Sequence, residues 1–244
     1  TTAKPKPLHY GVLLLPSVTP IDVFGPVDVF TALAMTFTNQ TGKLEFSVLS
    51  VNSTPATTNP PLKGLDFGFP LLPTITFDQY RQLKAHNFTA DEHDKHYNKT
   101  VIKNKGPLDV LIVPGGGGAR AEISKEIAFV KEIYPDLKYI ISVCTGSTVL
   151  ARAGVLDGKR ATTNKKAWAW ATSFGKNVKY QPKARWVSDG NVWTGSGVSA
   201  ATDTAYAFVA DIYGEDVAQY VADVSEYTRW TNASLDPFAE RWGV

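Results

Sequence analysis

Apolar, β-branched runs along the chain predict buried strands. These runs occupy residues 8–15, 44–50, 109–113 and 138–143. The first run is apolar nearly throughout, as expected for a parallel sheet that is covered on both faces. Residues 186–188 and 192–194 flank Asp189-Gly190-Asn191, which is typical of a hairpin turn.

Helical patterns alternate with these strands. Gly25-Pro26 predicts the start of a helix over residues 27–33, because proline suits the first turn of a helix. Further helices are predicted at 124–134, 148–153, 167–172, 199–213 and 215–230. This alternation predicts an α/β fold with a doubly wound, mostly parallel sheet and helices on both faces.

No repeat or linker divides the sequence, so residues 1–244 are expected to form a single domain. A polar stretch at about 81–107 predicts an inserted surface loop. It holds His86, His93 and His96, with acidic residues among them. A metal site and a solvated loop are the two alternatives there. The spacing matches no helical pair of metal ligands, so we predict a solvated loop and no metal.

Composition narrows the functional class only a little. Hydrophobic residues make up 43% and charged residues 20%, as in an ordinary globular protein. The net charge is +2 and no basic stripe is visible, which argues against nucleic acid as a partner. No run of 18 apolar residues occurs, so no membrane span is expected.

Asn-x-Ser/Thr sequons indicate a compartment. Five of the ten asparagines lie in such sequons, where roughly one or two would be expected by chance. They are Asn39, Asn52, Asn87, Asn98 and Asn232. The sequence also starts without methionine, as a processed mature protein would. Together these features favour a secreted, extracellular eukaryotic protein with N-linked glycans over coincidence.

The only cysteine, Cys144, stands where a nucleophile would stand. It ends an apolar strand, and a helix follows within a few residues, which resembles a nucleophile elbow. A helix N-terminus stabilises a thiolate, so this position predicts a lowered pKa for the thiol. The alternative is a small buried hydrophobic residue, the usual fate of a lone free cysteine.

A run of four glycines, 115–118, also follows a strand. Such a loop lets backbone amides approach a ligand or an oxyanion. The spacing fits neither a phosphate loop nor a dinucleotide-binding motif. Asp22 follows the first strand, and the carboxyl ends of parallel strands share one edge of a sheet. Asp22, the glycine run and Cys144 are therefore expected to converge, although loop bracing is the commoner role for an Asp before Gly-Pro.

These motifs resemble the DJ-1/PfpI family, and within it the isonitrile hydratase subgroup. The matching segments are 20–30, 108–116, 143–163 and 195–203. The resemblance covers roughly residues 8–230 and implies a flavodoxin-like fold and a homodimer. It implies a small-molecule substrate, with Cys144 as nucleophile and Asp22 beside its sulfur. It also implies that Thr145 supplies a backbone amide and that Gly116 and Gly117 complete an oxyanion pocket. No cofactor is expected.

One position departs from the subgroup. Asn164 stands where a histidine usually follows Ala161-Thr162-Thr163, and an amide cannot exchange a proton with a substrate. The favoured expectation is hydration of an isonitrile through a thioimidate on Cys144, with Asp22 carrying the proton. The alternatives are glyoxalase-like or amidase-like chemistry on the cysteine, and a secreted, non-catalytic binding or redox-responsive glycoprotein. The chain ends soon after the last predicted helix, so no DNA-binding extension is expected.

Overall fold

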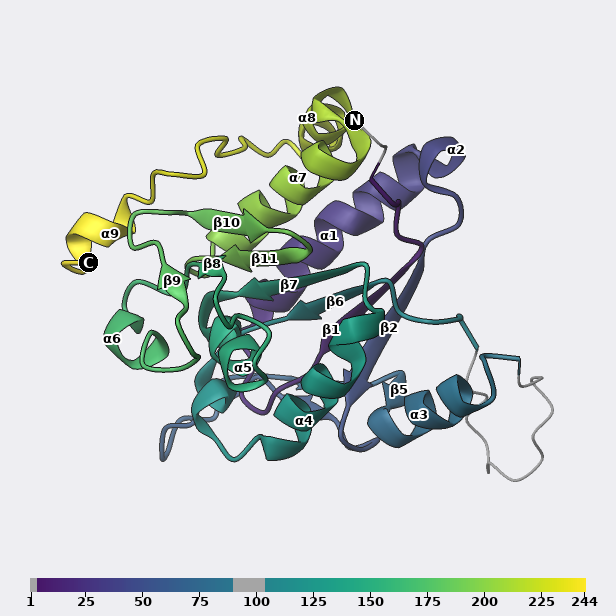
Figure 1. Cartoon of the computed structure of the whole chain (residues 1–244), viewed down its shortest axis with the longest axis horizontal. Coiled ribbons are helices and arrows are strands. Elements are labelled where there is room, and N and C mark those ends of the chain that lie inside the picture. The colour runs from purple at the N-terminus through teal and green to yellow at the C-terminus, as the bar shows by residue number, and fades with distance from the viewer. Residues whose placement is uncertain (1–3, 90–103) are drawn as a thin grey trace.

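A seven-stranded sheet in the order β10-β11-β7-β6-β1-β2-β5 forms the centre of the molecule (Figure 1). The computed structural model describes residues 4–89 and 104–244. All neighbouring strands of this sheet are parallel except β10 and β11. The strands are β1 (His9–Leu13), β2 (Glu45–Ser50), β5 (Ile75–Thr76), β6 (Val110–Val113), β7 (Tyr139–Val143), β10 (Trp186–Asp189) and β11 (Val192–Gly195).

Helices cover both faces of the sheet (Figure 1). One face packs against α1 (Pro20–Thr36), α7 (Ala200–Tyr213) and α8 (Glu215–Val224). The other packs against α3 (Phe77–Ala85), α4 (Ser124–Ile133) and α5 (Ser147–Arg152). Because side chains alternate along a strand, Tyr10 and Val12 belong to the first apolar cluster and Leu13 to the second. The mostly parallel α/β fold predicted from the sequence is therefore confirmed.

Shorter elements surround this sheet. Two small sheets pair β3 (Ala56–Thr57) with β4 (Pro70–Leu71) and β8 (Arg160–Ala161) with β9 (Lys179–Tyr180). The short helices are α2 (Thr38–Thr41), α6 (Trp168–Ala171) and α9 (Phe238–Arg241). Single 3₁₀ turns are η1 (Gly117–Arg120), η2 (Tyr134–Asp136) and η3 (Cys144–Gly146).

Helix α1 begins seven residues earlier than predicted. The sequence suggested a start after Pro26, but Pro20 takes the first turn and Pro26 lies inside the helix. A proline within a helix leaves the carbonyl four residues earlier without its usual donor, and that residue is Asp22. Asp22 therefore lies in the first turn of a helix and not in the loop after a strand.

Other predicted boundaries shift at the ends of elements. Helix α8 ends at Val224 and not at residue 230. The surface loop predicted at about 81–107 overlaps α3, which runs to Ala85, and residues 90–103 lie outside the described part. Among the helices of residues 4–89 and 104–244, none has both the length and the apolar character needed to cross a membrane.

Candidate functional site

Cys144 lies in a strained elbow between β7 and α5. Its φ is +56°, a left-handed conformation that a residue with a side chain rarely adopts. Such strain persists only where the surroundings hold it, and it is common at functional sites. The residue is 5% exposed, so the sulfur has only a narrow opening. The elbow that the sequence predicted is therefore present.

Two buried hydroxyls fix the elbow from behind. Ser147 Oγ and Thr163 Oγ1 each donate to the carbonyl oxygen of Cys144, at 3.2 Å. The two hydroxyls also contact each other at 2.7 Å. Because the Cys144 carbonyl accepts from both, the positive φ is held from two separate elements, α5 and the segment after β8.

Asp22 is fully buried beside the thiol. Its Oδ2 accepts the Gly115 N–H at 2.9 Å, and its Oδ1 has no hydrogen-bond partner among the described residues. Burial raises the pKa of Asp22 from 3.8 to about 7, although the Gly115 N–H and the nearby Cys144 thiol act in the opposite direction. Asp22 can therefore gain or lose a proton near neutral pH.

The glycine run lets the backbone approach this pair closely. A Cβ on Gly115 would lie 2.6 Å from the Thr145 nitrogen and 3.0 Å from Asp22 Oδ2. Gly116 has a φ of +127°, and its N–H donates to Thr145 Oγ1 at 3.0 Å. Its amide therefore already has a partner. The oxyanion role expected for Gly116 and Gly117 stays a prediction that requires this hydroxyl to turn away.

Asn164 contacts the sulfur of Cys144 directly. Its Nδ2 donates to Cys144 Sγ at 3.2 Å. Its Oδ1 accepts the Ala167 N–H at 2.9 Å, which fixes the orientation of the carboxamide with the nitrogen toward the sulfur. Asn164 therefore supplies a fixed donor to the sulfur and no titratable group.

The pKa of the thiol differs from the sequence prediction. Burial and the Asp22 carboxylate raise the pKa of Cys144 far above its ordinary value, while the backbone and hydroxyl of Thr145 and the Asn164 amide lower it less. The expected lowering by a helix N-terminus is therefore wrong for the resting site. Cys144 begins the short 3₁₀ turn η3, and burial, followed by the Asp22 carboxylate, has the largest effect on the pKa of the thiol.

Of the two histidines among the described residues, His9 and His86, neither forms a hydrogen bond with Cys144. His9 is buried at the start of β1, where its Nε2 is 2.8 Å from Ser47 Oγ and its Nδ1 is 3.0 Å from the Gly106 carbonyl oxygen. His86 caps the end of α3, whereas His93 and His96 lie outside the described residues. No group of three or more His, Cys, Asp or Glu side chains in the described parts could hold a metal ion.

Four of the five sequon asparagines fall in the described residues. Asn39, Asn52, Asn87 and Asn232 are all exposed, and Asn98 lies outside. Asn52 Oδ1 accepts the Thr54 N–H at 2.9 Å, and Asn232 Oδ1 accepts the Ser234 N–H at 3.0 Å. These two sequons therefore adopt Asx turns on the surface.

Sequence reasoning missed three parts of the site. It did not place Asn164 on the sulfur, did not give Ser147 and Thr163 a role, and did not find the buried charges behind Asn164. Ser147 and Thr163 lie inside the motifs around Cys144, but other hydroxyl residues such as Thr145, Thr148 and Thr162 stand beside them, so no local signal distinguished these two. The charges come from segments distant in sequence, for which no local pattern exists.

A doubly wound sheet with a strained cysteine at a strand-to-helix turn, and a buried acid beside it, defines a cysteine-elbow α/β protein. The chain belongs to the DJ-1/PfpI family, which it matches over residues 12–212. It is 31% identical to an isonitrile hydratase of Pseudomonas putida over 222 residues, which cover 90% of this chain and 78% of that protein.

Two further relatives support the family. A Parkinson disease protein 7 homolog of Danio rerio is 33% identical over 121 residues, which cover 48% of this chain and 62% of that protein. The crystal structure of a THiJ/PfpI family protein from Pseudomonas syringae aligns with a TM-score of 0.67 and 26% identity. That alignment covers 92% of this chain and 77% of that one.

Proposed function

We propose that the protein is a cysteine-dependent enzyme that hydrates a small electrophile, such as an isonitrile, to an N-substituted formamide. The observation that carries this proposal is the pairing of a strained, buried cysteine with an acid whose pKa is about 7 and whose Oδ1 is unpartnered. The similarity to an isonitrile hydratase over 90% of the chain supports the choice of substrate class.

In the first step the sulfur of Cys144 forms a bond with the terminal carbon of the isonitrile. Asp22 takes the thiol proton and delivers it to the same carbon, which gives a thioimidate, R–N=CH–S–Cys. The Asn164 amide and the Thr145 backbone lie at the sulfur and stabilise its negative charge as the proton leaves. A terminal, linear reacting group suits a cysteine that is only 5% exposed as a residue.

In the second step water adds to the thioimidate carbon. Asp22 accepts a proton from the water and passes it to the imidate nitrogen, which gives R–NH–CH(OH)–S–Cys and leaves Asp22 ionised. The carbon–sulfur bond then breaks, the hydroxyl proton returns through Asp22 to the sulfur, and R–NH–CHO leaves. The sum is isonitrile plus water to formamide, so no cofactor and no oxidant is needed.

Asn164 favours hydration over the glyoxalase-like and amidase-like alternatives. Glyoxalase-like and amidase-like reactions usually depend on a histidine that exchanges a proton with the substrate. In this protein Asn164 donates a hydrogen bond to the sulfur from a carboxamide of fixed orientation. Asp22 is the titratable group described beside Cys144. The arrangement therefore favours a reaction in which one acid carries every proton.

Turnover of small aliphatic and aromatic isonitriles, followed by NMR detection of the formamide, tests the proposal. We expect Cys144→Ala to abolish turnover and Asp22→Asn to lower kcat by about 100-fold or more, as for loss of a general acid–base. Asp28→Asn is a matched control, because Asp28 is an exposed residue on the same helix. Full turnover in Asp22→Asn, or methylglyoxal consumption without formamide formation, would contradict the proposal.

We further propose that the protein is a secreted homodimer with N-linked glycans. Four sequon asparagines are exposed and two of them form Asx turns, which leaves their side chains accessible. Ile21 and Phe24, apolar residues near the start of α1, are exposed and suit a dimer face. Light scattering of protein secreted from a eukaryotic host, before and after glycosidase treatment, should show two chains and a loss of mass. A monomer would contradict the proposed dimer, and an unchanged mass would contradict the proposed glycans.

A further inference from the structure

A buried cluster of charges lies directly behind Asn164. It contains two cations, Lys165 and Arg185, and two carboxylates, Asp203 and Asp236, so its formal charge sums to zero. The side chains of Lys165 and Asp236 are each only 1% exposed. Buried charges are costly unless they are paired and hydrogen-bonded, so a cluster of this kind must hold specific segments together.

Lys165 ties down the segment that carries Asn164. Its Nζ donates to Thr162 Oγ1 and to the carbonyl oxygen of Ala184, both at 2.7 Å. Residues 162–165 form no helix or strand, so regular backbone pairing does not fix them. The side chain of Lys165 therefore anchors this segment to the stretch before β10.

Asp236 supplies the counter-charge from the C-terminal segment, residues 225–244. Its Oδ2 lies 3.8 Å from Lys165 Nζ and accepts the hydroxyl of Ser196. The same hydroxyl is 3.3 Å from the carbonyl oxygen of Thr163. Ser196 therefore links Asp236 to the backbone just before Asn164. Burial lowers the pKa of Lys165 to about 8 and Asp236 opposes this shift, so the carboxylate keeps the ammonium charged.

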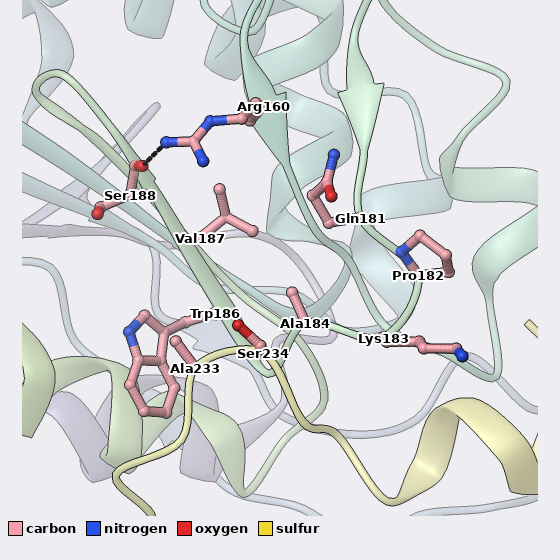
Figure 2. Close-up of a pocket in the computed structure, with 10 residues that line it drawn as sticks. All are labelled: Arg160, Gln181, Pro182, Lys183, Ala184, Trp186, Val187, Ser188, Ala233 and Ser234. Carbon is pink, nitrogen blue, oxygen red and sulfur yellow. Dashed lines mark hydrogen bonds between the residues drawn. The ribbon is translucent and has the colours of Figure 1, made fainter.

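Hydrogen bonds join the C-terminal segment to the body both at its start and near Asp236. At its start, the Tyr227 hydroxyl and the Trp230 N–H donate to Asp203 Oδ1, at 2.9 and 3.0 Å. The Asp236 N–H donates to the Lys183 carbonyl at 2.7 Å, and the Arg185 N–H donates to the Ala233 carbonyl at 2.8 Å. Figure 2 shows the pocket that remains between Ala233 and Ser234 and the edge strand β10, a cavity of about 420 Å³. Asp203 fixes the start of this segment, and Asp236 is the residue through which the segment pairs with Lys165.

We propose that Asp236 is a positioning residue for the thiol site: it holds Lys165, and through Lys165 the turn that places the Asn164 carboxamide on Cys144 Sγ. The C-terminal segment is therefore part of the functional site, although it does not touch the sulfur. This inference rests on Cys144 being the reactive group of the proposed function.

The pH profile of Cys144 alkylation, read by intact mass, tests this coupling without a substrate. Asn164→Ala removes the donor to the sulfur, so the profile should move to higher pH and the rate at pH 7 should fall about threefold or more. Asp236→Asn should move the profile in the same direction. In the Asn164→Ala background, Asp236→Asn should cause no further change, because it acts through Asn164.

A second readout follows the turn itself. The Ala167 N–H donates to Asn164 Oδ1, so its hydrogen exchange reports whether the carboxamide is docked. Asp236→Asn should speed this exchange at least tenfold relative to the amide of Ile141 in β7. Asp109→Asn is the matched control, because that carboxylate pairs with Lys138 at 3.1 Å and accepts the Leu8 N–H near the start of β1.

Two results would overturn the positioning role. One is an unchanged Ala167 exchange rate in Asp236→Asn, and the other is an effect on alkylation that adds fully to that of Asn164→Ala. If the wild-type thiol resists alkylation, the exchange rate alone decides. Failure of isonitrile hydration would leave both readouts intact, so it would refute the proposed reaction and not this inference.

Discussion

At the scale of single residues, Cys144 and Asp22 act as one titrating pair. Burial and the Asp22 carboxylate raise the pKa of the Cys144 thiol, whereas the thiol lowers the pKa of Asp22 against the larger effect of burial. When Asp22 is ionised, the thiol keeps its proton. A thiolate therefore forms most easily when its proton passes to Asp22, which is the transfer that the proposed reaction needs.

This pairing predicts opposite effects of Asp22→Asn on two reactions of the same sulfur. The Asp22 carboxylate raises the pKa of the thiol, so its removal should lower that pKa and speed simple alkylation at pH 7. Each unit of pKa gives about tenfold more thiolate, but nucleophilicity falls with pKa, so the net gain is about threefold per unit. Turnover, which needs the proton carrier, should fall.

Alkylation with iodoacetamide across pH 5–10, beside the turnover assay, measures both directions. A small, neutral reagent is needed, because the cysteine residue is only 5% exposed. Asp28→Asn should leave both rates at the wild-type values. Slower alkylation in Asp22→Asn would show that Asp22 promotes ionisation of the resting thiol, contrary to the pairing described here.

At the scale of elements, the elbow depends on hydroxyls from two segments. The Cys144 carbonyl accepts from Ser147 in α5 and from Thr163 after β8. Neither segment alone determines the backbone conformation of the cysteine. The strained φ of +56° is therefore a property of the contact between them.

Thr163→Val should loosen this contact while it keeps the side-chain shape. We expect a loss of about 1–3 kcal/mol in the free energy of unfolding, because a buried hydrogen bond is removed and Ser147 loses one partner. Urea denaturation measures the loss. Thr204→Val is the control, because the Thr204 hydroxyl bonds only the Ala200 carbonyl of its own helix and should cost less. Equal losses in the two variants would argue against a special role for the elbow.

The sequence predicted the elements around the site better than the contacts within it. The strands ending at Val113 and Val143 were predicted to within a residue, because short, continuous apolar runs are strong local signals. The start of α1 was missed because Gly25-Pro26 is a typical helix start, while burial of the helix face allows Pro26 inside. Local propensity was overridden by packing there.

The contacts within the site could not be predicted from the sequence. The shared edge of the sheet allowed Asp22 to converge with Cys144. The residue type and spacing of Asp22 alone favoured a bracing role, and the family resemblance implied its place beside the sulfur. The raised pKa of the thiol, the Asn164 contact and the link to Asp236 all depend on burial and on residues far apart in sequence. No periodicity or motif reports the depth of a side chain or the approach of a distant segment.

At the scale of the whole molecule, the two apolar clusters stabilise the fold, whereas the functional site destabilises it. The clusters on either face of the sheet bury large aromatic and aliphatic side chains such as Phe129 and Phe208. Burial on this scale can offset an unpartnered carboxyl oxygen and a strained backbone in one place. The functional site therefore lowers the free energy of unfolding of an otherwise well-packed fold.

Asp22 should make the free energy of unfolding depend on pH. Its pKa is about 7 in the folded protein and near 3.8 when unfolded, so the unfolded chain releases the proton first as pH rises. Stability should therefore fall between pH 4 and 7, by roughly 2–4 kcal/mol, and then level off. Asp22→Asn carries no such charge, so it should match the wild type at pH 4 and exceed it at pH 8. Urea denaturation of both proteins at these two pH values, with Asp28→Asn alongside, measures the difference. A gap that is as large at pH 4 as at pH 8 would show that Asp22 is not held protonated by burial, and the proton transfer proposed for it would lose its physical basis.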